Sequence, residues 1–182
     1  MMRKILSFCF SGVLLIFVWS CGNQKDLRNR ANAENKIFQQ EDGLISLNLE
    51  MAACYNDLVN PSSNTAEWNI VVSKPGRYNV WLSSATKDTT DLSYTNSVKI
   101  SLLDNRIEGN PGCDKVVQNS GDVSYPFYRT DSHMGSFFIP EPGEYTIQII
   151  SEKVISKESK IRELSISDNT KLMSLSLIPM TR

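Results

Sequence analysis

Histidine is almost absent from this chain of 182 residues, which contains only His133. A hydrolase built on Ser, His and Asp would have to use that residue, and no G-x-S-x-G motif accompanies it. A zinc site needs a cluster of His and Cys ligands, and one histidine with scattered cysteines provides none. These shortages disfavour two common kinds of catalytic site, and we expect a protein that is not an enzyme.

A surplus of basic residues is also missing. The chain has 19 Lys and Arg against 20 Asp and Glu, whereas nucleic-acid binders usually carry excess positive charge. We therefore expect no nucleic-acid partner. The length suits one domain with a substantial core.

The N-terminus has the pattern of a secretory leader. Arg3 and Lys4 precede an uncharged stretch from Ile5 to Trp19, which is shorter than the roughly 20 apolar residues of a membrane span. The polar residues from 22 to about 36 show no periodicity and predict a flexible tether.

The end of the leader, Val18-Trp19-Ser20-Cys21, resembles the lipobox of bacterial lipoproteins. The resemblance implies a signal peptide over 1–20, a tether over 21–36 that begins with an acylated Cys21 (a palmitate-type anchor), and a domain over 37–182. It places the protein in the bacterial cell envelope, at the outer membrane, with more than one acyl chain for stable anchoring. The alternatives are an uncleaved signal anchor, or an ordinary cleaved leader with an incidental Cys21.

Beyond the tether the hydrophobic pattern has the period of two that is typical of half-buried strands. Each expected strand places three apolar residues on one face. These triplets are Trp68, Ile70 and Val72; Tyr78, Val80 and Leu82; Val98, Ile100 and Leu102; Tyr145, Ile147 and Ile149; and Met173, Leu175 and Leu177. The segment from 151 to 164 is ambiguous, and we expect a loop with at most one helical turn.

One turn and strand is written twice, as PGRYNVWL (75–82) and PGEYTIQI (142–149). Proline fixes φ at the second position of a turn and glycine tolerates the positive φ that a type II turn needs next, so the pattern predicts two hairpins. Many strands and no long amphipathic helix predict an all-β fold, with two antiparallel sheets packed as a sandwich.

These stretches, with QQEDGLISL before them and LMSLSLIP after them, follow an order that resembles β-sandwich modules of the family-six carbohydrate-binding type. Such modules are appended to bacterial α-L-fucosidases and sulfatases. The resemblance covers residues 37 to 179. It implies a jelly-roll, galactose-binding-like sandwich whose partner is a glycan or polysaccharide.

Calcium-dependent members of this group hold a structural Ca²⁺ with acids of the first strand and an acid near the last strand. Glu41 and Asp42 match the first part, and the final strand KLMSLSLIPM contains no acid. The expectation is therefore no cofactor, with a structural Ca²⁺ at Glu41 and Asp42 as the alternative.

Sugar binding needs an aromatic ring to stack on a pyranose and polar side chains to bind its hydroxyls. Two places offer this mixture, and the alternative for their aromatic residues is a role in closing the core. The expected ligand-binding residues are Tyr125, Tyr128, Arg129, Asp131 and His133 between two strands, and Tyr94 with Asn96.

Trp81 is a third expected site. Alternation places it opposite the buried face of its strand, where the second copy has Gln148. Either a crossing segment covers it, or it forms the floor of a sugar-binding groove on the sheet face.

Two cysteines remain once Cys9 leaves with the leader and Cys21 is acylated. Cys54 and Cys113 either form a disulfide, worth on the order of 4 kcal/mol for a loop of this length, or remain separate thiols with the packing role of small apolar residues.

The sequence thus predicts a lipid-anchored envelope protein that captures glycans without catalysis. The alternative is an envelope lipoprotein of the same fold that does not bind sugar and instead docks another envelope protein.

Replacing Cys21 with Ala should leave precursor or soluble protein in place of an acylated form, because the thiol is the point of lipid attachment. Detergent partitioning and the intact mass of the protein measure this. A C21A variant that still partitions wholly into the detergent phase would show that lipidation at this cysteine is wrong.

Overall fold

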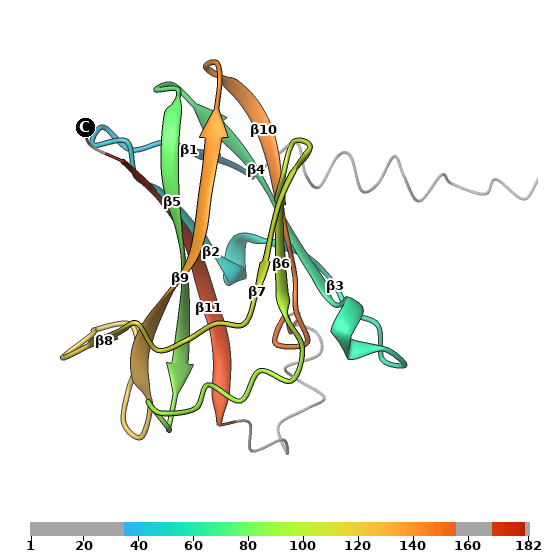
Figure 1. Cartoon of the computed structure of the whole chain (residues 1–182), viewed down its shortest axis with the longest axis vertical. Helices are drawn as coiled ribbons and strands as arrows, with labels where there is room; N and C mark the ends of the chain where they lie inside the picture. The colour runs from blue at the N-terminus through green and yellow to red at the C-terminus, as the bar shows by residue number, and fades with distance from the viewer. Residues whose placement is uncertain (1–34, 156–168, 181–182) are drawn as a thin grey trace, which may run out of the picture.

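The computed structural model describes residues 35–155 and 169–180. Two sheets pack face to face as a β-sandwich (Figure 1), which confirms the all-β prediction. Strands of sheet A are β1 (Lys36–Phe38), β3 (Ala53–Tyr55), β4 (Thr65–Val72), β6 (Val98–Leu102), β7 (Asn105–Gly109) and β10 (Gly143–Ile150). Strands of sheet B are β2 (Ile45–Asn48), β5 (Gly76–Thr86), β8 (Lys115–Val117), β9 (Tyr128–Ile139) and β11 (Thr170–Pro179).

The strand order is β1-β4-β10-β6-β7 in sheet A, with β3 also on β4, and β2-β11-β5-β9-β8 in sheet B. Neighbouring strands are antiparallel except β1, which runs parallel to β4. Two short 3₁₀ turns, η1 (Leu49–Met51) and η2 (Pro61–Ser63), complete the described elements. The expected leader, lipidated Cys21 and most of the tether lie outside the described residues, and the first strand begins at Lys36. Within 35–155 and 169–180 no helix is long and apolar enough to cross a membrane.

The two Pro-Gly sequences do not make hairpins, which corrects the sequence prediction. β4 lies in sheet A and β5 in sheet B, while β9 lies in sheet B and β10 in sheet A. Each connection has three residues between its strands, 73–75 and 140–142. Three residues are long enough to span the roughly 10 Å between packed sheets. Each Pro-Gly turn therefore carries the chain from one sheet to the other.

The strands that flank one connection pair with the strands that flank the other. β4 is antiparallel to β10, so that Gly143 pairs with Val72, and β5 is antiparallel to β9, so that Gly76 pairs with Ile139. Of these two glycines only Gly76 has a positive φ, of 151°. The expected type II geometry is therefore wrong at Gly143.

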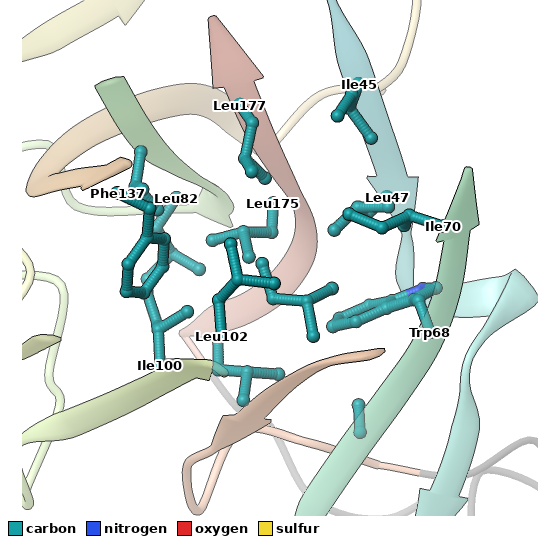
Figure 2. Packing of buried hydrophobic residues seen from close by; sticks show 14 of the residues in the cluster. Ile45, Leu47, Trp68, Ile70, Leu82, Ile100, Leu102, Phe137, Leu175 and Leu177 are labelled. Carbon is teal, nitrogen blue, oxygen red and sulfur yellow. The ribbon is translucent and has the colours of Figure 1, made fainter. Parts of the chain in front are cut away.

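The buried core lies between the sheets and contains the inward residues of both (Figure 2). The expected inward residues of β4, β5 and β6 are all buried, as are Ile147, Ile149, Leu175 and Leu177. Trp68 is 2% exposed, and its indole N–H donates to the Asn48 carbonyl at 2.8 Å. The prediction that Met173 faces the core is wrong. A β-bulge between Leu172 and Ser174 buries Leu172 in its place.

The Gln39 side chain ties the start of the domain to the first crossover. Its amide NH₂ donates to the Gly43 carbonyl at 2.8 Å and to the Tyr78 hydroxyl at 2.7 Å. Its carbonyl oxygen accepts from the backbone N–H groups of Ser73 at 3.0 Å and Lys74 at 2.7 Å. Tyr78 in turn donates to the Lys74 carbonyl. One amide thus holds the β1–β2 turn against the β4–β5 connection.

Of the ambiguous segment, residues 151–155 form a turn in which the Val154 N–H donates to the Ser151 carbonyl at 3.0 Å. The rest of the segment up to residue 164 lies outside the described part of the chain.

Gly43→Ala should destabilise the domain by about 1–3 kcal/mol. Gly43 has φ of 89°, and an added Cβ would lie 2.9 Å from Pro179 Cγ. Gly121 is the control, because it has ordinary φ and nothing within 4 Å of an added Cβ. Urea unfolding measures both variants, and equal stability losses at the two positions would contradict the packing described for Gly43.

Candidate functional site

The outward face of sheet B gathers most of the predicted ligand-binding residues. Alternation along β5 buries Tyr78, Val80 and Leu82 and turns Trp81 outward, where it is half-buried. Trp81 pairs with His133 of β9 on one side and with Ser176 of β11 on the other. Trp81 therefore lies near the middle of the central strand of this sheet.

A β-bulge brings the Trp81 and His133 rings together. The register shifts between Val80, which pairs with Gly135, and Trp81, which pairs with His133. Gly135 has φ of 142°, and an added Cβ would lie 3.3 Å from the Ile107 side chain, so glycine suits both the conformation and the space. The Trp81 and His133 ring centroids are 5.1 Å apart with the planes tilted by 59°.

His133 is held on both sides. Its backbone N–H donates to an Asp114 carboxylate oxygen at 2.7 Å, and its Nε2 lies 3.4 Å from Asn79 Oδ1. The imidazole itself is exposed. The strand thus presents an aromatic pair in which His133 is held by contacts with Asp114 and Asn79.

An ordered polar group continues the face beyond Trp81. The Arg129 guanidinium donates to Asp131 at 3.1 Å, to Asp122 at 2.5 Å and to the Ser83 hydroxyl at 3.3 Å. Ser83 also donates to Asp131 at 2.8 Å. Burial acts against the charge of Arg129, but the two carboxylates outweigh it, so the pKa of Arg129 lies above its ordinary value. The guanidinium therefore stays charged and fixed in place.

A groove of about 480 Å³ lies along this face, between η1 on one side and the segment before β9 on the other. Trp81 adjoins the groove, because its partner Ser176 lines it. Polar and charged side chains make up much of the lining, among them Asn48, Glu50, Asp122, Arg129, Lys171 and Ser174.

The structure merges two of the three predicted sites. Arg129, Asp131 and His133 were expected in a connection between strands, but β9 begins at Tyr128, so they alternate along the strand itself. They face outward between buried Thr130 and Ser132 and join Trp81. Tyr128 alternates in step with the buried residues Thr130 and Ser132, so it is on the inward side of the strand. It is nevertheless 48% exposed because it lies at the end of the strand.

The other predicted residues lie elsewhere. Tyr94 packs against the core with its hydroxyl 2.9 Å from Ser84 Oγ, and burial raises the pKa of this phenol far above its ordinary value. The ring is partly buried against the core, which corresponds to the core-closing alternative for this residue. Asn96 is exposed, and its backbone N–H donates to Glu152 at 3.4 Å. Tyr125 is exposed in the segment before β9.

Sequence reasoning missed Ser83, Asp122, Lys171 and Asn48. Ser83 could have been found from the sequence, since it is two residues after Trp81 and alternation places it on the same outward side of β5. The others come from β11, from the η1 side and from an irregular segment, and only the strand order brings them together.

Of the two calcium candidates, Asp42 makes a local contact through its carboxylate and Glu41 through its backbone carbonyl. Asp42 Oδ1 accepts from the Leu44 N–H at 2.9 Å, and the Glu41 carbonyl accepts from the Lys74 ammonium. Across the residues that the structure describes, no group of three or more His, Cys, Asp or Glu is placed to hold a metal ion.

Cys54 and Cys113 are not joined by a disulfide, so the structure corresponds to the second of the two alternatives. Cys54 lies in β3 and packs against the core, whereas Cys113 precedes β8 at the edge of sheet B. Burial, with a smaller contribution from Asp114, raises the pKa of the Cys113 thiol.

Comparison with known proteins shows the fold and no family. No protein-family model matches the chain, and no curated protein matches it. An α-L-fucosidase from Vibrio sp. strain EJY3 is similar in structure, with a TM-score of 0.60 and 21% identity over 80% of this chain and 24% of the fucosidase. This chain therefore corresponds to about a quarter of that enzyme. A GH26-CBM35 β-(1,4)-mannanase from Podospora anserina gives a TM-score of 0.45 and 13% identity over 78% of this chain and 29% of the mannanase.

Trp81→Ala should cost only about 1–2 kcal/mol of stability, because the ring is half-buried and packs on the sheet surface. Trp68 is the matched control, and Trp68→Ala should cost about 3–5 kcal/mol because that indole lies in the core. Urea unfolding of both variants measures the difference. Equal losses would mean that Trp81 is a covered structural residue.

Proposed function

We propose that this protein captures carbohydrate without catalysis, through the outward face of sheet B, while a lipid on Cys21 tethers it to the bacterial envelope. The observation that carries the sugar-binding part is Trp81, a half-buried outward indole whose β11 partner Ser176 lines a groove of about 480 Å³ with many polar side chains. An aromatic face next to fixed polar groups is what pyranose recognition requires.

The residues divide into two roles. Trp81 would stack on the C–H face of a sugar ring, with His133 limiting how the ring can approach, because the imidazole packs against the indole. Arg129 and Asp131 would exchange hydrogen bonds with hydroxyl groups, and the buried Ser83 hydroxyl would hold both of them in position. Because these groups are already held in place by one another, little side-chain entropy is lost on binding.

The structural comparison supports this proposal at the level of the fold. The similarity spans about a quarter of a fucosidase, which is the proportion expected of an accessory module within a larger enzyme. The sequence resemblance to carbohydrate-binding modules points to the same class.

Docking of an envelope protein is the second candidate, and the loop before η2 favours it. Leu58 and Val59 are 79% and 95% exposed. The loop that presents them is ordered, since Asp57 accepts from the Val59 N–H at 2.9 Å and the Asn60 N–H at 3.0 Å. A rigid loop with two exposed apolar side chains is suited to a protein contact.

A glycan array probed with residues 22–182 should show binding to one class of glycan, and Trp81→Ala should abolish that binding by removing the stacking surface. Phe38→Ala is the control, because Phe38 is an aromatic residue of sheet A with 68% exposure.

A blank array, with an envelope protein retained by the parent and lost in a Leu58→Ser, Val59→Ser variant, would favour the second candidate. Binding that survives Trp81→Ala unchanged would contradict the site proposed on sheet B.

A further inference from the structure

The outward face of sheet B extends well past the groove, toward the Pro-Gly crossovers. At that end β5 contributes Asn79 and Arg77, which pair with Ser136 and Phe138 of β9. Ile178 of β11 lies opposite Asn79 on the other side. Phe138 is 54% exposed and Ile178 is 42% exposed, so this end of the face is open to solvent.

The face has a regular composition along β5. Each outward position of β5 has a polar or charged side chain on itself or on a paired strand. These rows are Arg77 with Phe138, Asn79 with Ser136, Trp81 with His133, Ser83 with Asp131, and Ala85 with Arg129. Aromatic rings occur in the first and third rows. Between Phe138 and Trp81 a ligand that follows the strand would find hydrogen-bonding groups and a stacking surface at each end. Beyond Trp81, Ser83 and Ala85 are buried, and Arg129 supplies the accessible polar group.

The spacing of the rings sets the size of such a ligand. Arg77, opposite Phe138, is four residues from Trp81 along β5, or about 13 Å at the rise of an extended strand. The Arg129 end of the groove is a similar distance away on the other side, opposite Ala85. A single monosaccharide cannot bridge Phe138 and Trp81, whereas a chain of several sugar units can.

We infer that the ligand is an internal segment of a linear polysaccharide that lies along β5, with Phe138 as a second stacking residue beyond Trp81. This inference rests on the sugar-binding function proposed above and adds the size of the ligand and a residue to it. A polymer fits because the face is open at the Phe138 end, so the chain can extend past Phe138, and because Ser176 beside Trp81 lines the groove at the other end.

A protein partner fits this face less well. Phe138 and Ile178 lie on opposite sides of β5 with Arg77 and Asn79 between them, so they do not form a continuous hydrophobic centre. Stable protein interfaces have such a centre, with polar groups at the rim.

The test measures affinity against ligand length by calorimetry. The probes are the disaccharides, hexasaccharides and soluble polymers of the β-(1,4)-xylan, β-(1,4)-mannan and β-(1,4)-glucan series, together with homogalacturonan and its oligomers. The protein is residues 22–182 as parent, Phe138→Ala, Trp81→Ala and the control Phe38→Ala. Thermal melts check that each variant is folded.

For a series that binds, hexasaccharide and polymer should bind more tightly than disaccharide. Phe138→Ala should weaken hexasaccharide and polymer about 3- to 10-fold, the effect of losing one aromatic stacking contact. It should leave disaccharide binding unchanged, and Phe38→Ala should leave all lengths unchanged.

If Trp81→Ala abolishes binding but Phe138→Ala changes no length, the sugar site stands and the polymer inference is wrong. Equal affinity for disaccharide and hexasaccharide overturns the inference in the same way. If no probe and no arrayed glycan binds the parent, both proposals fail. If Phe138→Ala instead releases a co-purifying envelope protein, this end of the face is a protein contact.

Discussion

The sandwich depends on the antiparallel pairing of the strands that flank the two Pro-Gly crossovers. Each crossover supplies one strand to each sheet, and β4 with β10 and β5 with β9 are the resulting pairs (Figure 1). This explains why the Pro-Gly turn and the strand after it occur twice in the sequence: each copy, with the strand before it, provides one strand of both central strand pairs. The Gln39 amide, which binds Gly43, Tyr78 and the first crossover, joins the chain entry to that unit.

The same pairing makes the two sheet surfaces different. β5 and β10 occupy equivalent places in the two copies, but Trp81 faces outward from sheet B and Gln148 from sheet A. The bulge opposite Gly135 then places His133 beside Trp81, and Arg129 and Asp131 continue the face. The same position of the repeated strand therefore contributes an indole to the outward face of sheet B and an amide to that of sheet A.

Period-two alternation was sufficient to predict the fold class, the inward residues of β4, β5 and β6, and the outward direction of Trp81. It was not sufficient for connectivity, because a three-residue Pro-Gly segment can join strands within a sheet or between sheets, and only long-range pairing decides. The prediction failed for Met173 because a β-bulge changes which residues of the strand face inward, and no feature of the sequence marks the bulge. The residues around the groove come from β11, β9, η1 and an irregular segment, so their proximity depends on strand order. Tyr94 corresponds to the core-closing alternative, because an aromatic residue in a loop can pack against the core.

The central claim is that carbohydrate binds over Trp81. In residues 22–182 with Trp68→Phe, Trp81 is the sole indole, since the third tryptophan of the chain, Trp19, precedes residue 22. Its fluorescence should shift to shorter wavelength and become protected from acrylamide as a bound glycan is added, with saturation at the affinity measured by calorimetry. Unchanged emission and unchanged quenching at glycan concentrations that saturate the protein would contradict the account.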